Sequence, residues 1–493
     1  MNVLLIYPEF PDTFWSYKHA LKFVRKKAAL PPLGLLTIAS MLPEKWEKRM
    51  VDINVTIKLT QKDLEWADYV ILSAMVVQKK SAVKIISKCK EAGVKIIAGG
   101  PLFTSDYAEF EEIDYFVLNE AEITLPLFLA DLEQGNAKRI YKTTEFADIN
   151  KTPAPMWELA EMKRYASMSI QFSRGCPFNC EFCNVTSLFG HKPRTKTSEQ
   201  IIAELDSLYN LGWRDHVFFV DDNFIGNKRF LKTDLLPALI DWRKERREVT
   251  FYTEVSINLT DDEPLMQMMV DAGFDTVFIG IETPNEESLA ECSKKQNKGR
   301  DLVNDVKRLQ RAGLQVQAGF IVGFDNDSPS IFQRQIDFIQ KSGIVTAMIG
   351  LLQAPSGTKL YERMKREGRL LGEMSGDNGD CTTNIVTGMN KNALREGYLD
   401  ILRHIYSHEK YYQRIKTLLK EYKPSNIGAP LKFNDFMAFF RSTYILGIIS
   451  NERFHYWKLL IWAYIRKPKL FPLAVRLTIS GHHLHKIRDQ YLR

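Results

Sequence analysis

Three cysteines that stand close together carry the most specific chemical signal in this chain. Cys176, Cys180 and Cys183 are separated by three and then two residues. A [4Fe–4S] cluster is normally held by four cysteine thiolates, so a lone triplet predicts a cluster with one iron open to an outside ligand. An open iron indicates chemistry at the cluster rather than electron storage alone.

Two other uses of cysteine fit this pattern less well. A structural zinc site needs four ligands, commonly in two separated pairs, and no second Cys or Cys/His pair lies nearby; His191 is the nearest candidate. Six cysteines in 493 residues, with no signal peptide, indicate a reducing compartment rather than a disulfide framework. We therefore expect a cytoplasmic protein with a cluster. The single cysteines are expected to be buried small side chains: Cys89, Cys292 and Cys381.

Short apolar runs alternate with charged, helix-period stretches in the middle of the chain. Such alternation predicts parallel strand-helix-strand units. Six runs predict a partial (β/α)6 barrel over residues 151–384, with strands at 168–172, 216–220, 250–253, 276–280, 317–322 and 347–352. Active groups of parallel barrels gather at the C-terminal ends of strands. Polar or glycine residues stand at those ends here: Asp221, Asp222, Asn223, Glu254, Glu282 and Gly323.

Residues 1–150 predict a separate α/β unit. Mainly apolar runs at 2–7, 69–73, 94–98 and 115–118 are expected to be fully buried strands, and they alternate with amphipathic stretches, which indicates a small doubly wound, Rossmann-like sheet. Gly99 and Gly100 follow the third run and permit close approach of a ligand, although a tight turn explains them equally well. The segment Thr152-Pro-Ala-Pro155 is expected to be the linker to the barrel.

The cysteine motif, after 168–172 and the turn Ser173-Arg174-Gly175, resembles the signature of radical S-adenosylmethionine (SAM) enzymes. The resemblance implies that the open iron binds the methionine part of SAM. One electron then cleaves the sulfonium bond and gives a 5′-deoxyadenosyl radical. It also implies contacts to SAM from Phe182, Asp221, Asp222, Asn223, Glu254, Gly319 and Gly323. Capping of the following helix remains an alternative role for the Asp-Asp-Asn triplet, and for Glu282 site and structural roles are evenly balanced.

The N-terminal unit resembles the cobalamin-binding domain of one radical SAM subfamily. The matching segments are Pro31-Pro-Leu-Gly34, Met75-Val-Val-Gln78, Gly99-Gly-Pro101 and Asn119-Glu-Ala-Glu122. Bound cobalamin is therefore expected, with contacts from Met75, Gln78, Gly99 and Gly100. No Asp-x-His-x-x-Gly string occurs, so a domain histidine is not expected to hold the cobalt. A domain that kept the fold and lost the cofactor is the alternative.

Other segments, such as 171–176, 191–197 and 218–227, are similar to the hopanoid C-methylase branch. This resemblance implies methylation of an unactivated carbon of a lipid such as a hopanoid, with a flavodoxin or ferredoxin as electron donor. Lipid modification by the same radical without methyl transfer, through carbon–carbon coupling or dehydrogenation, and a non-catalytic carrier of cluster or cobalamin are the alternatives. No side chain is selected as an acid, base or hydrogen relay.

Residues 385–493 predict a helical domain, with helical spacing over about 392–422 and a break at 423–430. From Arg441 onward ten Lys/Arg stand against two Asp/Glu, so all the excess charge of the +7 chain is local. Trp and Tyr among these charges suit either peripheral contact with an anionic membrane or packing onto the barrel. No nucleic-acid-binding module is recognised. His482, His483 and His485 form either a metal site or a polar chain end.

Overall fold

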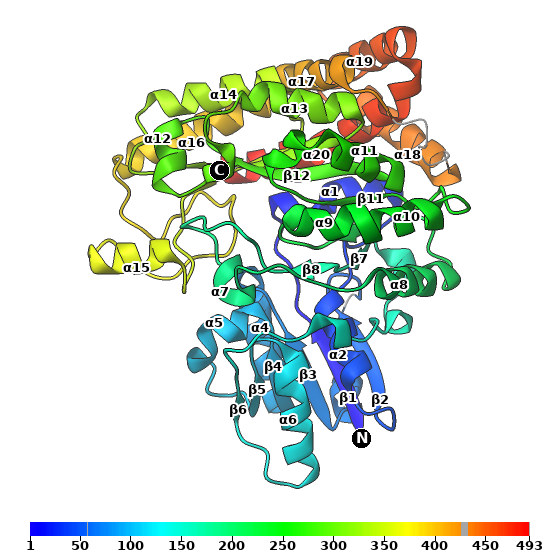
Figure 1. Cartoon of the computed structure of the whole chain (residues 1–493), viewed down its shortest axis with the longest axis vertical. Coiled ribbons are helices and arrows are strands. Elements are labelled where there is room, and N and C mark those ends of the chain that lie inside the picture. Colours follow the sequence, from blue (N-terminus) through cyan, green and yellow to red (C-terminus); the bar gives the residue numbers. More distant parts are fainter. Residues whose placement is uncertain (57, 425–431, 493) are drawn as a thin grey trace.

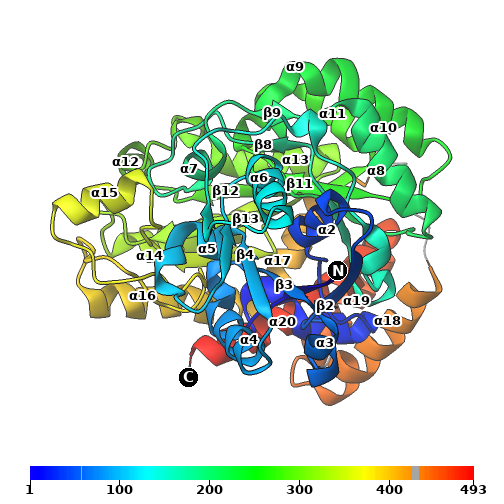
Figure 2. The same cartoon turned by 90° about the horizontal axis from the view of Figure 1, so that it is seen from below.

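The computed structural model describes residues 1–56, 58–424 and 432–492. A parallel sheet lies at one end of the long axis, a barrel in the middle and helices of the C-terminal region at the other end (Figure 1). Seen along that axis, the N-terminal strands lie in front of the barrel strands (Figure 2). The carboxyl ends of the N-terminal strands point towards the barrel (Figure 1).

The N-terminal sheet is wholly parallel, with strand order β2-β1-β3-β4-β5-β6. Alternate strand residues point to opposite faces: Leu4 and Ile6 pack with α3, α4 and α5, whereas Val3 and Leu5 pack with α2 and α6. The predicted doubly wound fold is therefore confirmed. The strands are β1 (Asn2–Tyr7), β2 (Glu47–Asp52), β3 (Tyr69–Ser73), β4 (Lys95–Gly99), β5 (Tyr115–Val117) and β6 (Ile140–Tyr141).

The two edge strands of this sheet, β2 and β6, are not predicted by the sequence pattern. Strand β2 begins Glu47-Lys-Arg and is half exposed, and β6 has two residues, so neither shows the apolar run of a central strand. The helices of this unit are α1 (Lys18–Leu21), α2 (Leu33–Met41), α3 (Gln61–Trp66), α4 (Lys79–Glu91), α5 (Pro101–Asp106) and α6 (Ala121–Glu133).

The middle unit is the expected six-stranded partial barrel, with order β14-β13-β12-β11-β10-β7 and every neighbouring pair parallel. Its strands are β7 (Met168–Ile170), β10 (Val217–Phe219), β11 (Phe251–Glu254), β12 (Phe274–Glu282), β13 (Gln315–Val322) and β14 (Ala347–Leu351). Its helices are α7 (Val185–Phe189), α8 (Ser198–Asn210), α9 (Lys228–Phe230), α10 (Leu236–Arg243), α11 (Glu263–Ala272), α12 (Glu286–Glu291), α13 (Leu302–Ala312), α14 (Ser330–Ser342) and α15 (Lys359–Arg366).

The connection from β1 to α2 leaves the N-terminal sheet and packs on the barrel. Trp15 meets the ring of Phe278, on strand β12, edge to face at 5.2 Å between centroids. Phe14 and Phe23 belong to the same buried cluster as the barrel strands and the C-terminal helices. The boundary expected near residue 150 remains a prediction, because part of the first 150 residues shares a core with the barrel.

The C-terminal region contains α16 (Lys391–Ile405), α17 (His408–Glu421), α18 (Phe433–Tyr444), the π-helical turn η12 (Ile445–Ile449), α19 (Arg453–Arg466) and α20 (Phe471–Tyr491). The stretch predicted as helical over 392–422 is thus two helices, and residues 425–430 of the predicted break lie outside the described residues. Among the helices of the described residues, none is both long and apolar enough to cross a bilayer.

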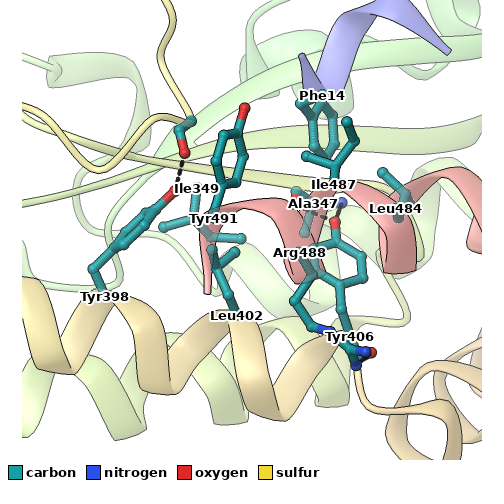
Figure 3. Close-up of a pocket in the computed structure, with 11 residues that line it drawn as sticks. Phe14, Ala347, Ile349, Tyr398, Leu402, Tyr406, Leu484, Ile487, Arg488 and Tyr491 are labelled. Atoms are coloured by element: carbon teal, nitrogen blue, oxygen red, sulfur yellow. Dashed lines mark hydrogen bonds between the residues drawn. The ribbon is translucent and has the colours of Figure 1, made fainter. Parts of the chain in front are cut away.

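A small cavity lies where Phe14, β14, α16 and α20 meet (Figure 3). Tyr398 donates to the carbonyl of Gly379 at 2.7 Å, and Tyr406 donates to the carbonyl of Ala347 at 2.5 Å. The space is about 10 Å³, roughly the room of one water molecule. It is a packing defect at the junction of these four segments and is too small to be the active site.

Candidate active site

The cysteine loop leaves the barrel at the end of β7. Strand β8 (Ser173–Arg174) pairs antiparallel with β9 (Arg194–Thr195) and closes the base of this loop. Cys176, Cys180 and Cys183 are all partly exposed and free. The loop therefore presents three unpaired thiols at the carboxyl end of the barrel, as the sequence predicted.

Asp221 anchors the chain just before this loop. Its carboxylate accepts hydrogen bonds from the backbone N–H of Phe172 at 3.1 Å and of Ser173, and from the Ser173 hydroxyl at 2.5 Å. The residue is fully buried. These bonds give Asp221 a structural role that the sequence did not reveal, and direct contact with SAM stays a prediction for it.

The thiols suit a metal-centred group better than a free nucleophile. Burial raises the pKa of Cys183 to about 12 and also raises the pKa of Cys176. Such thiols ionise when they coordinate a metal. The amide nitrogen of Gln296 lies 3.8 Å from the Cys180 sulfur, so a polar donor already faces this ligand. The donor set thus fits an iron–sulfur cluster.

Two carboxylates that follow or end neighbouring barrel strands, Asp222 after β10 and Glu254 on β11, lie near one another. Burial, followed by the charge of Asp222, raises the pKa of Glu254 to about 8, and burial raises the pKa of Asp222 to about 6. A bound cation would favour the ionised carboxylates, since opposite charges nearby stabilise the charged form. SAM carries a sulfonium and an ammonium, so Glu254 and Asp222 suit this ligand.

Glu282 and Lys294 lie close to these two carboxylates. Strand β12 has a bulge between Gly280 and Glu282, where Glu282 adopts φ of +63°, a conformation that non-glycine residues seldom take. The bulge turns the carboxylate towards Lys294, whose Nζ lies 2.7 Å from Oε1. Burial lowers the pKa of Lys294, but the charges of Glu282 and then Cys180 outweigh this effect and raise the pKa above its usual value. A fixed ammonium therefore faces the cysteines.

Asn223 does not cap the helix that follows it, which was one of the two roles considered for it. It stands before the 3-10 turn η8 (Phe224–Asn227), but its side chain makes no capping hydrogen bond. Its Oδ1 instead accepts from the backbone N–H of Ser256 at 3.1 Å and from the Ser256 hydroxyl at 3.3 Å. Asn223 thus joins the ends of β10 and β11, and its contact with SAM stays a prediction.

The other residues predicted for SAM lie around the same face. Phe182 packs against Phe324, with 6.4 Å between ring centroids, beside Lys294. Gly323 ends β13 with φ of +107°, and its N–H donates to Asp327 at 2.9 Å. A side chain at Gly319 would meet the ring of Phe278 at 3.1 Å. The space beside Gly319 is therefore occupied by Phe278, which was not expected.

Met75 follows β3 at the carboxyl edge of the N-terminal sheet and is 47% exposed. Gln78 is fully buried and binds within the protein, accepting from the Met75 N–H at 2.9 Å and donating to the Pro8 carbonyl at 2.6 Å. Gln78 therefore positions the Met75 loop, and a direct cofactor contact from it stays a prediction.

Gly99 and Gly100 serve the turn after β4. A side chain at Gly99 would meet the carbonyl oxygen of Val117 at 2.7 Å, and one at Gly100, where φ is +88°, would meet the Ser73 hydroxyl at 2.4 Å. The tight turn explains both glycines, and it also keeps the strand edge free of side chains. His19 lies in α1, which packs against α20, so it does not supply a ligand at this edge.

Two ion pairs join this edge to the cysteine loop. Arg174, two residues before Cys176, binds Glu122 in bidentate fashion at 2.7 and 3.1 Å. Arg194, on β9, binds Glu120 at 2.5 and 2.8 Å. We call these four residues the interdomain clamp. Both glutamates belong to the segment Asn119-Glu-Ala-Glu122, one of those that resemble the cobalamin-binding domain. Their arginine partners lie 52 and 74 residues away in the sequence, so the pairing can be recognised only in the folded structure.

Comparison with known families divides the chain in the same order. Residues 25–129 match the B12 binding domain, residues 170–339 match the radical SAM superfamily, and residues 358–493 match a domain of unknown function (DUF4070). The first two matches contain the interdomain clamp glutamates and the cysteine loop, respectively.

Two relatives resemble most of the chain. An uncharacterized methyltransferase of Synechocystis sp. is 40% identical over 99% of this chain and 92% of its own length. Hopanoid C-2 methylase of Rhodopseudomonas palustris is 35% identical over 75% of this chain and 71% of its own length.

Two solved structures share the fold at low sequence identity. The cobalamin-dependent SAM radical enzyme OxsB has a TM-score of 0.62 at 15% identity, covering 100% of this chain and 83% of its own. The radical SAM methyltransferase TsrM of Kitasatospora setae has a TM-score of 0.60 at 14% identity, covering 99% of each chain.

Proposed function

Because the chain belongs to the cobalamin-binding radical SAM family of enzymes, we propose that it transfers a methyl group to an unactivated carbon of a lipid such as a hopanoid. The interdomain clamp is the observation that carries the methyl-transfer part. It ties the cysteine loop directly to the sheet edge that carries the B12 match. A radical formed at the cluster and a methyl group held by cobalamin must reach the same substrate, so the two cofactors must lie near one another. The interdomain clamp would keep their two binding regions side by side.

Each group of site residues is proposed to bind a different cofactor. Cys176, Cys180 and Cys183 would hold the [4Fe–4S] cluster, Glu254 and Asp222 would face the cationic parts of SAM, and Met75 would lie against cobalamin. When bound, the cluster and SAM supply a 5′-deoxyadenosyl radical, and cobalamin supplies a transferable methyl group. The barrel residues orient the substrate hydrogen and exclude water. Radical abstraction needs no acid or base, and we assign none.

The test uses purified, anaerobically reconstituted protein, SAM carrying a deuterated methyl group, a low-potential reductant, cobalamin and a hopanoid substrate. We expect a product that has gained the labelled methyl group, and we expect 5′-deoxyadenosine to form with it. A product that is coupled or dehydrogenated and carries no label would instead support radical modification of the lipid without methyl transfer. No SAM cleavage at all by cluster-loaded protein would support a carrier. The lipid profile of cells with and without the gene would identify the substrate.

A lipid substrate is supported by a large apolar surface on the C-terminal helices. We call it the apolar face: side chains along α18, η12 and α19 that are between 38% and 77% exposed. They are Phe433, Phe436, Phe440, Tyr444, Ile448, Ile449, Phe454, Trp457, Ile461, Tyr464 and Ile465. These three elements contact one another in sequence, α18 with η12 and η12 with α19, and exposed apolar side chains gathered in this way are typical of an interaction site.

The chemistry around the apolar face favours a bilayer surface as its occupant. Arg453, Lys458, Arg466 and Lys469 are exposed along and just beyond α19. Aromatic and aliphatic side chains with neighbouring cations are typical of helices that lie in the headgroup region of anionic membranes. The face lies at the end of the molecule away from the N-terminal sheet (Figure 1). Docking there would leave the interdomain clamp clear of the lipid.

We expect the triple variant Phe440→Asp, Phe454→Asp, Ile461→Asp to bind vesicles containing anionic lipid at least about tenfold more weakly than wild type. All three side chains are more than half exposed, so the fold should be retained. Cosedimentation measures the bound fraction. Leu127→Asp, at a position 58% exposed on α6, is the matched control and should bind normally. If the wild-type protein did not bind vesicles but formed a dimer, and the triple variant were monomeric, a second copy of the chain would be the partner that covers this face.

A further inference from the structure

Three helices of the C-terminal region bring histidines around one buried carboxylate. Glu452 precedes the first turn of α19 and is 1% exposed. His408 begins α17, and His482 and His485 lie one turn apart on α20. This His/Glu cluster takes no part in the proposed reaction, and its members are far apart in the sequence.

The distances in the cluster are too long for good hydrogen bonds. The Nδ1 atoms of His408 and His485 lie 3.5 and 3.4 Å from the same oxygen of Glu452, Oε2. An N–H···O hydrogen bond is normally about 2.7 to 3.2 Å. In a tetrahedral zinc site with bonds of about 2.0 to 2.2 Å, two ligand atoms are separated by about 3.4 Å. The two His–Glu spacings thus fit ligands of one metal ion, and one ligand atom from each of the three residues lies within 4.8 Å of the others.

The Nδ1 atoms of His408 and His485 face Glu452 at ion-pair distance but make no hydrogen bond of good geometry. Within the described part of the chain, Nδ1 of His408 and both ring nitrogens of His485 have no hydrogen-bond partner, although His485 is only 4% exposed. An unpaired polar atom at such a position carries a desolvation cost. The two rings stand at 88° to one another with centroids 4.4 Å apart, so they converge on Glu452 from different directions.

From this geometry we infer that His408, Glu452 and His485 bind a divalent metal ion of the zinc type, with His482 as a candidate fourth ligand. Nδ1 of His482 lies 3.9 Å from Oε1 of Glu452. Two or three imidazoles with one carboxylate suit zinc. Tyr412 and Ser450 donate to Glu452 at 3.1 and 3.3 Å and fix its orientation. The side chain of His408 is 35% exposed, which provides an entry path.

The site would be structural. It joins the first residue of α17, the residue before α19 and the middle of α20. These helices pack together and α19 carries half of the apolar face. A metal that binds only the folded state stabilises it by mass action. The inference stands independently of the proposed methyl transfer.

The experiment measures zinc and iron in full-length protein expressed with zinc supplement. Because three cysteines without a cluster could also bind zinc, it includes the full-length variant Cys176→Ala, Cys180→Ala, Cys183→Ala. We expect about one zinc per chain in this variant, and less than about a tenth of that when His408→Ala and His485→Ala are added. His455→Ala, on α19 but outside the cluster, is the matched control and should keep its zinc.

A second measurement covers the case in which the histidine variant fails to fold. The variant that lacks the three loop cysteines is stripped by a chelator and then titrated with Co²⁺ alone. We expect the visible absorption of a tetrahedral ion to saturate near one equivalent, and the melting temperature to rise by roughly 5 °C. Zinc-free protein with no cobalt spectrum, or zinc that persists in the folded histidine variant, would overturn the inference.

Discussion

Cys180→Ala is expected to lose both the absorbance of the iron–sulfur cluster and all formation of 5′-deoxyadenosine. Iron should fall from about four atoms per chain to nearly none, since two thiolates cannot retain a cubane that already lacks a fourth protein ligand. Cys180 is partly exposed and faces Gln296, so its replacement should disturb the fold little. Iron analysis, visible spectra and chromatography of SAM products measure these effects under anaerobic conditions.

Cys292→Ala is the matched control for this loss. Cys292 lies on the same side of the barrel, but it is 2% exposed and packs in an apolar cluster with Phe324 and Leu360. We expect the control to keep its iron and to cleave SAM at nearly the wild-type rate. If Cys180→Ala kept either the cluster or SAM cleavage, the assignment of the three cysteines would be wrong.

Breaking the interdomain clamp should uncouple the two halves of the reaction. In Glu122→Ala the guanidinium of Arg174 loses a bidentate partner in a site where both side chains are largely buried, at 13% and 11% exposure. The cysteines are untouched, so the cluster should still assemble. We expect SAM cleavage to fall by no more than about tenfold and methyl transfer by about a hundredfold or more, because a shift of about 1 Å is enough for such a loss.

The ratio of methylated product to 5′-deoxyadenosine is the informative measurement for this variant. Unfolding alone would lower both products together, whereas a displaced N-terminal sheet lowers the ratio. Lys45→Ala breaks an ion pair with Glu133 in the same unit whose side chains are 73% and 77% exposed. It should change neither product, since exposed pairs contribute little. An unchanged ratio in Glu122→Ala would show that the interdomain clamp does not align the two cofactor sites.

The sequence alone was sufficient where the signal lies within a few residues. The spacing of Cys176, Cys180 and Cys183 predicts a cluster because ligands of one metal group must lie close together. Apolar runs of strand length predict the parallel sheet and the barrel because strands that are covered on both faces consist mainly of apolar side chains. The edge strands β2 and β6 were missed because half-exposed or two-residue strands have no such constraint.

Tertiary structure decided which polar groups meet. Asp221 and Asn223 look like site residues or helix caps in the sequence, yet Asp221 holds Ser173 and Asn223 holds Ser256. Glu120 and Glu122 gained a role only when their arginines, distant in the sequence, came beside them. The sequence left open whether the aromatic residues of the C-terminal region are exposed or pack on the barrel, because helical spacing predicts an apolar stripe but not what covers it. The His/Glu cluster likewise exists only because three helices converge. Side-chain pairing across the chain depends on how whole elements pack, and local spacing does not encode that.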